Sequence, residues 1–341
     1  MKPAAKAVAF IALALSLTFS AGAKALKVAC VGNSITYGYG LEHRDRESYP
    51  SQLQQLLGDG YEVGNFGHSG ATLLRKGHRP YVDQPAFRQA LDFDADVAVI
   101  HLGLNDTDSR NWPDFRDEFI SDYCALIDSF RTHNPSMRVM ICRMTPVFHN
   151  HPRFKSSTRD WYLQVQDAID CVAEHAGVDV IDLHEPLAHR PDLFSADALH
   201  PNAVGAGIIA SEVSKAITGN YGGLKLPSVY TDGMVIQRDK PFTVAGKANA
   251  GAPVTVRFGG VVRSARTGSN GRWSVTLPSM PASGQGSRLT VISPDSVINI
   301  NDVLVGDVWI CSGQSNMAFQ VVESVGAEVA EQIGYAESKP L

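Results

Sequence analysis

Short apolar runs alternate with amphipathic stretches from Leu26 to about Asn220 of the 341-residue chain. The apolar runs have the length of buried strands, and the stretches between them carry apolar residues with a helical period. The predicted strands are 26–31, 62–65, 96–102, 138–142 and 178–183, and the predicted helices are 49–57, 112–132, 157–176 and 201–218. Strands that alternate with helices pair in parallel, so this pattern predicts a three-layer α/β domain with right-handed crossovers.

The pattern changes after Asn220, where Val- and Thr-rich runs are broken by Gly, Pro, Ser and Asn and no helical period remains. The runs 253–258, 273–277 and 289–292 predict strands of an all-β sandwich. A further apolar run, 307–311, predicts a strand that leads into a Gly-x-Ser sequence, as the first strand does. We therefore predict an α/β domain over 24–220, a β-sandwich domain over 221–304 and, over 305–341, the start of a truncated second α/β domain.

The first 23 residues have the pattern of a secretory signal peptide. Lys2 and Lys6 precede an apolar run from Ala7 to Ser20, and Ala21-Gly22-Ala23 supplies small residues for cleavage after Ala23. This apolar run is too short for a comfortable membrane span, so we expect no stable membrane insertion. The predicted location of the mature protein is periplasmic or secreted.

Charge and cysteine content exclude two further classes of protein. The chain has 30 Lys and Arg against 35 Asp and Glu, and this acidic balance argues against a nucleic-acid partner. The five cysteines form no Cys-x-x-Cys pair, so neither a disulfide framework nor a zinc site is expected. We expect Cys30, Cys124, Cys142 and Cys171 to be small buried side chains.

A candidate nucleophile, Ser34, directly follows the first predicted strand, at the carboxyl edge where parallel sheets keep their functional sites. A serine hydroxyl needs a base to take its proton, and that base needs an orienting carboxylate. Asp197 and His200 supply both groups, three residues apart and just before the predicted helix at Pro201. The sequence therefore predicts a Ser34–His200–Asp197 triad.

Two further loops can provide donors for a developing oxyanion. Gly70 lies in Asn65-Phe-Gly-His-Ser-Gly70 after the second strand, and Asn105 lies in Gly103-Leu-Asn-Asp106 after the third. A glycine allows close backbone approach, and an asparagine donates through its side-chain amide. We predict an oxyanion hole made by the backbone N–H groups of Ser34 and Gly70 and the amide of Asn105.

Taken together and in order, the blocks Gly-Asn-Ser-Ile-Thr, Asn-Phe-Gly-His-Ser-Gly, Gly-Leu-Asn-Asp and Asp-Ala-Leu-His-Pro-Asn resemble those of the SGNH, or GDSL-type, hydrolases. The first block departs slightly, because many members have Gly-Asp-Ser there. The resemblance covers about residues 26–219. It implies a three-layer flavodoxin-like fold and esterase activity without metal or other cofactor, with the roles given above for Ser34, Gly70, Asn105, Asp197 and His200.

A second resemblance covers the remainder of the chain. The segments 226–238, 271–275 and 306–317 are similar to the front part of the sialate O-acetylesterases. In that family the β domain precedes a hydrolase domain whose nucleophile lies in Gly-Gln-Ser-Asn-Met, which maps to Ser315 here. The later blocks of such a domain are absent from the chain, so the resemblance implies that Ser315 is a vestigial, inactive nucleophile.

The expected function is a serine esterase that removes O-acetyl groups from glycans, with sialic acids as the leading substrate. An acetylxylan esterase or a GDSL-type lipid or thioester hydrolase is the alternative within the same chemistry, since the motifs do not specify a substrate. A glycan-binding protein with a relict hydrolase domain is the alternative from another class.

Two smaller expectations concern histidines. We expect His101 to be a hydrogen-bonded core residue, and we expect His149 and His151 to lie in a solvated loop rather than in an acceptor pocket or a metal site.

Overall fold

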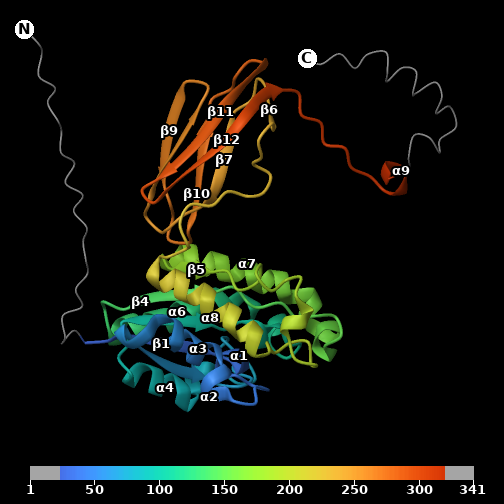
Figure 1. Ribbon diagram of the computed structural model, residues 1–341. Coiled ribbons are helices and arrows are strands. Elements are labelled where there is room, and N and C mark those ends of the chain that lie inside the picture. Colours follow the sequence, from blue (N-terminus) through green and yellow to red (C-terminus); the bar gives the residue numbers. More distant parts are fainter. Residues whose placement is uncertain (1–23, 319–341) are drawn as a thin grey trace, which may run out of the picture.

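The computed structural model describes residues 24–318 (Figure 1). Its first part contains a five-stranded sheet of β1 (Leu26–Gly32), β2 (Tyr61–Gly67), β3 (Val97–His101), β4 (Arg138–Cys142) and β5 (Asp179–Ile181). The strand order is β2-β1-β3-β4-β5, and all four pairings are parallel. The predicted parallel α/β sheet is thus confirmed. All residues of β3 are buried, as expected of a strand with helices on both faces.

Helices lie on both sides of this sheet (Figure 1). They are α1 (Ser34–Tyr37), α2 (Arg44–Glu47), α3 (Tyr49–Leu57), α4 (Pro85–Asp92), α5 (Trp112–Phe115), α6 (Phe119–His133), α7 (Arg159–Ala176) and α8 (Ala203–Thr218). Helix α3 packs against α8, and α6 packs against α7. The Phe87 ring of α4 meets Phe130 of α6 edge to face, so α4 lies in the same layer as α6. The sequence pattern did not predict α4.

The helix predicted over 112–132 is divided into α5 and α6 by a 3-10 turn, Arg116–Glu118. Phe115 leaves the helical region with φ −126° and ψ 5°. The Trp112 indole donates to Gln164 of α7 at 2.9 Å, and its ring meets Phe119 edge to face at 5.4 Å. These contacts of Trp112 hold α5 in place, and the non-helical backbone at Phe115 separates it from α6.

The second part of the chain forms two sheets over a separate apolar core. Its strands are β6 (Val235–Gln237), β7 (Phe242–Lys247), β8 (Pro253–Phe258), β9 (Val261–Arg266), β10 (Arg272–Leu277), β11 (Ser283–Ser293) and β12 (Ser296–Gly306). One sheet has the order β6-β12-β11-β8-β9 and the other pairs β10 with β7. Buried and outward-facing residues alternate along β8 and β10, which is the pattern of sheets with one face on a core. These strands are consistent with the predicted β sandwich.

The strand predicted at 307–311 is absent, and a short helix α9 (Ser315–Ala318) follows it. Trp309 and Ile310 are 84% and 92% exposed. A strand needs a neighbour to pair its backbone groups, and none of the described strands pairs with this segment, although the Val308 N–H donates to the side chain of Gln237 in β6. The predicted signal peptide and most of the predicted terminal domain lie outside the described residues. Within 24–318, no helix is both long and apolar enough to cross a membrane.

The five cysteines all lie in the described part of the chain, and none is paired. Cys30 and Cys142 are buried in the sheet, as expected. Cys171 is exposed, so the expectation of a buried side chain is wrong there. It lies on the outward face of α7, whose inward face carries residues such as Val165 and Ile169.

His101 is buried at the end of β3, but the expectation that it is hydrogen-bonded is wrong. Neither ring nitrogen has a hydrogen-bond partner among the described residues. Burial lowers the pKa of His101 to about 4, because the apolar surroundings disfavour the charged imidazolium. The side chain is therefore neutral at physiological pH and leaves polar atoms unsatisfied.

We expect His101→Leu to stabilise the protein, because it replaces an unsatisfied polar ring by an apolar side chain of similar size. The expected gain at neutral pH is about 1–3 kcal/mol in the free energy of unfolding. The gain in stability should grow as the pH falls from about 6.5 to about 4. In this range His101 binds a proton in the unfolded wild-type chain but not in the folded one, which destabilises the wild type and not the variant. Urea unfolding of both proteins across this pH range measures the difference. A variant that is less stable at pH 7, or a pH-independent difference, contradicts the interpretation.

Candidate active site

Ser34 begins α1 immediately after β1, at the carboxyl edge of the parallel sheet. The side chain of Asn33 caps this helix by accepting the N–H of Ile35 at 3.0 Å. Gly32 is needed because a Cβ there would lie 2.1 Å from the Thr36 hydroxyl. The strand therefore turns sharply into α1 and holds the Ser34 side chain at the sheet edge, largely buried at 8% exposure.

The structure brings Ser34, His200 and Asp197 into one hydrogen-bonded chain. His200 Nε2 lies 2.8 Å from Ser34 Oγ, and His200 Nδ1 lies 2.5 Å from Asp197 Oδ2. The other carboxylate oxygen of Asp197 accepts the backbone N–H groups of Leu199 and His200. These bonds fix the loop before α8, so the imidazole is held between the hydroxyl and the carboxylate.

The environment of Asp197 keeps its carboxyl group ionised. Partial burial raises the pKa of Asp197, but the hydrogen bonds from the His200 ring and from two backbone N–H groups outweigh burial. The net result is a pKa below the ordinary value of an aspartate. An ionised carboxylate accepts a proton-bearing Nδ1, which leaves Nε2 of neutral His200 as the acceptor for the Ser34 proton.

The two predicted oxyanion-hole residues lie on the loops that follow β2 and β3, the strands on either side of β1. Gly70 has φ +81°, a conformation that favours glycine. Asn105 lies in the 3-10 turn Leu104–Thr107, and its Nδ2 donates to the carbonyl of Ala71 at 2.9 Å. The two loops are therefore joined beside the end of β1, while the role of both residues toward an oxyanion stays a prediction.

Asp106, which the sequence analysis gave no role, holds the same two loops together. Its buried carboxylate accepts the backbone N–H groups of Leu73 and Leu74 at 2.9 and 2.8 Å. Burial raises the pKa of Asp106 to about 7, while these two hydrogen bonds act in the opposite direction. In the sequence, the only feature that marks Asp106 is its position next to Asn105. That position does not distinguish a buried structural carboxylate from one that caps a helix.

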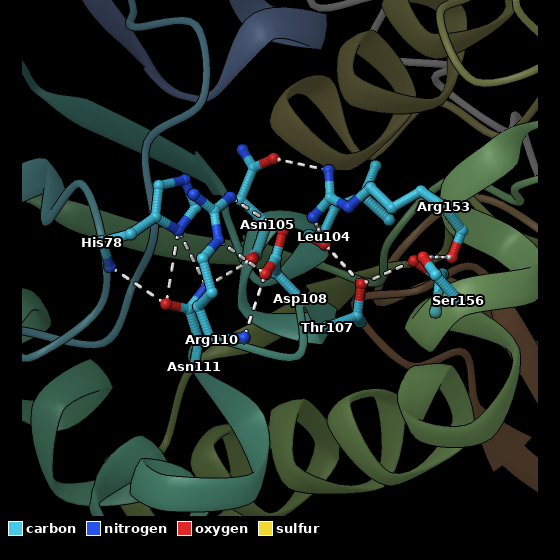
Figure 2. A network of polar contacts seen from close by, with 10 residues as sticks. His78, Leu104, Asn105, Thr107, Asp108, Arg110, Asn111, Arg153 and Ser156 are labelled. Carbon is cyan, nitrogen blue, oxygen red and sulfur yellow. Dashed lines mark hydrogen bonds and ion pairs between the residues drawn. The ribbon is translucent and has the colours of Figure 1, made fainter.

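Figure 2 shows a polar network around Asn105 that the sequence analysis also missed. Arg153, from the helical turn that leads into α7, reaches both the side chain of Asn105 and the carbonyl of Leu104. Asn111 bonds the carbonyl of Asn105 and the backbone N–H of His78. No motif marks these residues, because they come from loops far apart in the sequence.

The loop that carries His149 and His151 lies on the catalytic side of the sheet. The backbone N–H of Phe148 donates to the carbonyl of Ala198, next to the predicted triad. His149 is exposed, whereas His151 is partly buried and accepts the backbone N–H of Arg153. Across residues 24–318, no group of three or more His, Cys, Asp or Glu side chains is placed to hold a metal ion.

The Tyr39 ring lies 4.8 Å from the His200 ring and is 54% exposed, so it flanks the site on the solvent side.

Ser315 is exposed on α9, and no hydrogen bond of the described residues joins it to a histidine. The structure therefore does not bring Ser315 together with a base in this part of the chain.

The chain shares sequence with curated esterases over part of their length. An acetylxylan esterase of Xylanibacter ruminicola is 35% identical over 213 residues, which cover 57% of this chain and 43% of that protein. A sialate O-acetylesterase of Rattus norvegicus is 30% identical over 125 residues, which cover 33% of this chain and 23% of that protein. The chain thus spans less than half the length of these relatives.

Solved structures give partial matches. A carbohydrate acetylesterase from Xanthomonas citri is 34% identical over 31% of this chain and 24% of its own, with a TM-score of 0.29. An aryl esterase of M. smegmatis is 18% identical over 57% of this chain and 99% of its own, with a TM-score of 0.45.

A family match covers the whole candidate site. Residues 30–208 match the GDSL-like lipase/acylhydrolase family, and this range includes Ser34, Gly70, Asn105, Asp197 and His200. The match extends over more than half of the chain. The protein therefore belongs to the GDSL-like lipase/acylhydrolase family of ester hydrolases.

Proposed function

We propose that this protein is a serine esterase that removes O-acetyl groups from carbohydrates. The observation that carries the proposal is the hydrogen-bonded chain from Ser34 Oγ through His200 to Asp197. A hydroxyl bonded to a neutral imidazole, which a carboxylate orients, is the arrangement that activates serine for acyl transfer.

In the proposed reaction, Ser34 Oγ attacks the acetyl carbonyl while Nε2 of His200 takes the hydroxyl proton. The carbonyl oxygen becomes an oxyanion, held by the backbone N–H groups of Ser34 and Gly70 and by Nδ2 of Asn105. His200 then returns the proton to the sugar oxygen as the C–O bond breaks, which leaves acetyl-Ser34. Water, deprotonated by His200, then attacks the carbonyl carbon of this ester, and His200 returns the proton to Ser34 Oγ as the bond between that carbon and Oγ breaks and acetate leaves. Asp197 orients the imidazole and stabilises its protonated form throughout.

Two relatives support a carbohydrate as the leaving group, and each suggests a different one. The acetylxylan esterase matches the larger share of this chain, which favours an acetylated polysaccharide. The sialate O-acetylesterase favours O-acetylated sialic acid, the substrate that the sequence resemblance implies. Both substrates release acetate by the same chemistry, so the proposal for the catalytic residues does not depend on the choice.

Substrate preference can be tested with p-nitrophenyl esters of increasing acyl length and with acetate release from acetylated xylan and O-acetylated sialic acid. We expect the highest kcat/KM with the acetyl ester and release of acetate from at least one of the two carbohydrates. A maximum with long acyl chains such as octanoate or palmitate would instead identify a lipid or thioester hydrolase. Tight glycan binding without turnover of any ester would identify a glycan-binding protein with a relict hydrolase domain.

A further inference from the structure

The side chain of Asn105 can serve the proposed oxyanion hole in only one of its two amide orientations. Its Nδ2 end carries donors, which stabilise a negative oxygen, whereas its Oδ1 end would repel that oxygen. A residue that fixes the orientation of this amide therefore affects the rate of ester hydrolysis. This inference rests on the proposed function.

Arg153 fixes the Oδ1 end. Its Nη1 donates to Asn105 Oδ1 at 2.9 Å, and its Nη2 donates to the carbonyl of Leu104 at 3.1 Å. A guanidinium has donors and no acceptor, so it bonds the oxygen end of an amide and not the nitrogen end. The two bonds come from one planar guanidinium, which therefore ties the side chain of Asn105 to the backbone of the turn that carries it (Figure 2).

The Nδ2 end of Asn105 is fixed by a group of the opposite kind. It donates to the carbonyl of Ala71 at 2.9 Å, and a carbonyl can only accept. Rotating the amide by half a turn would put its NH₂ group against the guanidinium of Arg153 and its oxygen against the carbonyl oxygen of Ala71. Both contacts would then be repulsive. The second N–H of Nδ2 has no partner among the described hydrogen bonds, and it is the donor available to an oxyanion.

The backbone of Asn105 is held independently of Arg153. Asn111 Nδ2 donates to the carbonyl of Asn105 at 2.8 Å, and Asn111 Oδ1 accepts the backbone N–H of His78 at 2.9 Å. The neighbouring Asp106 is anchored to Leu73 and Leu74. Loss of the Arg153 side chain should therefore leave the turn in place and free mainly the amide of Asn105.

The charge of Arg153 acts in the same direction as its geometry. Burial lowers the pKa of Arg153 and the charges of Asp108 and Asp106 raise it, but an arginine remains protonated in proteins. The carboxylate of Asp108 is already bonded to Arg110 at 2.8 and 2.9 Å. A positive charge thus lies one hydrogen bond behind the amide and polarises its N–H toward the oxyanion.

We propose that Arg153 is a positioning residue for the oxyanion hole, which holds the amide of Asn105 with its N–H toward the reacting carbonyl and strengthens that donor. It acts through Asn105 and does not itself touch the substrate. The role concerns the transition state, because the oxyanion forms only there.

Arg153→Met should lower kcat for p-nitrophenyl acetate by about 10- to 100-fold, less than the 10²- to 10³-fold typical for loss of an oxyanion donor, with little change in KM. Arg153→Lys keeps the charge but not the planar fork, so its kcat should lie between those of Arg153→Met and the wild type. Arg159→Met is the matched control, since Arg159 is exposed, begins the following helix α7 and, within residues 24–318, pairs only with its neighbour Asp160. We expect wild-type kcat for this control.

A double-mutant cycle separates action through Asn105 from a general structural effect. If Arg153 acts through Asn105, Arg153→Met in the Asn105→Ala background should lower kcat by less than about twofold. Equal losses of kcat in both backgrounds, or an effect on KM alone, would overturn the proposal. Thermal unfolding shows whether each variant is folded, and if Arg153→Met is not, the same cycle with Arg153→Lys decides.

Failure of this proposal and failure of the proposed function give different results. If Ser34→Ala retains the wild-type rate, the proposed function itself is wrong. If Ser34→Ala and Asn105→Ala lose activity while Arg153→Met retains wild-type kcat, only the role of Arg153 is wrong.

Discussion

Replacing Ser34 by alanine should lower kcat for ester hydrolysis by roughly 10⁵- to 10⁶-fold, because it removes the atom that forms the bond to the acyl group. Binding and the oxyanion donors can still favour direct attack by water, so a small residual rate above the uncatalysed reaction is expected. Initial rates with p-nitrophenyl acetate, measured at high enzyme concentration, test this. The variant should keep the unfolding midpoint of the wild type, since Ser34 lies at the edge of the sheet outside the apolar core and the change removes a single hydroxyl group.

Ser315→Ala is the control for Ser34→Ala. Ser315 lies in the Gly-Gln-Ser-Asn-Met sequence but is exposed on α9, with no histidine bonded to it in residues 24–318. We expect its rate to equal that of the wild type. Hydrolysis within tenfold of wild type in Ser34→Ala, or a large loss in Ser315→Ala, would contradict the assignment of the nucleophile.

Asp197→Asn should lower kcat by about 10³- to 10⁴-fold while KM changes by only a few fold. The substitution keeps the shape of the side chain but removes the negative charge that the neighbouring N–H groups favour. An amide whose nitrogen faces Nδ1 also stabilises the tautomer that carries its proton on Nε2, which cannot accept the Ser34 proton. Both effects act on the transition state rather than on substrate binding.

Steady-state kinetics of Asp197→Asn beside Asp192→Asn provide the measurement and its control. Asp192 is exposed, lies in the same region before α8 and pairs with Arg190, so its loss should leave kcat unchanged. A loss of less than tenfold in Asp197→Asn would show that the carboxylate is not needed to orient His200.

The sequence predicted those parts of the fold that depend on local patterns. The central strands β1, β3 and β4 are buried along most of their length, and their continuous apolar runs identify them without knowledge of their neighbours. Ser34 and Asn105 follow such strands and Gly70 follows the edge strand β2, so their common position at the carboxyl edge of the sheet also follows from the strand pattern. The approach of His200 to Ser34, 166 residues away, was expected because four motifs in a known order pointed to it.

The parts that the sequence did not predict depend on contacts between distant segments. Arg153 and Asn111 act through loops whose meeting has no signature in spacing. The break between α5 and α6 follows from the packing of Trp112 against Gln164 and Phe119. The run at 307–311 has the composition of a strand, but composition alone does not supply the neighbour that a strand must pair with.

The most direct test of the account is to identify the residue that carries the acetyl group during turnover. The enzyme is mixed with p-nitrophenyl acetate, quenched in acid within the first turnover, digested and analysed by peptide mass spectrometry, with His200→Ala treated in the same way. We expect one acetyl group on Ser34 of the wild type and almost none in His200→Ala. Acetylation of a different residue in step with turnover, or equal acetylation of Ser34 without His200, would contradict it.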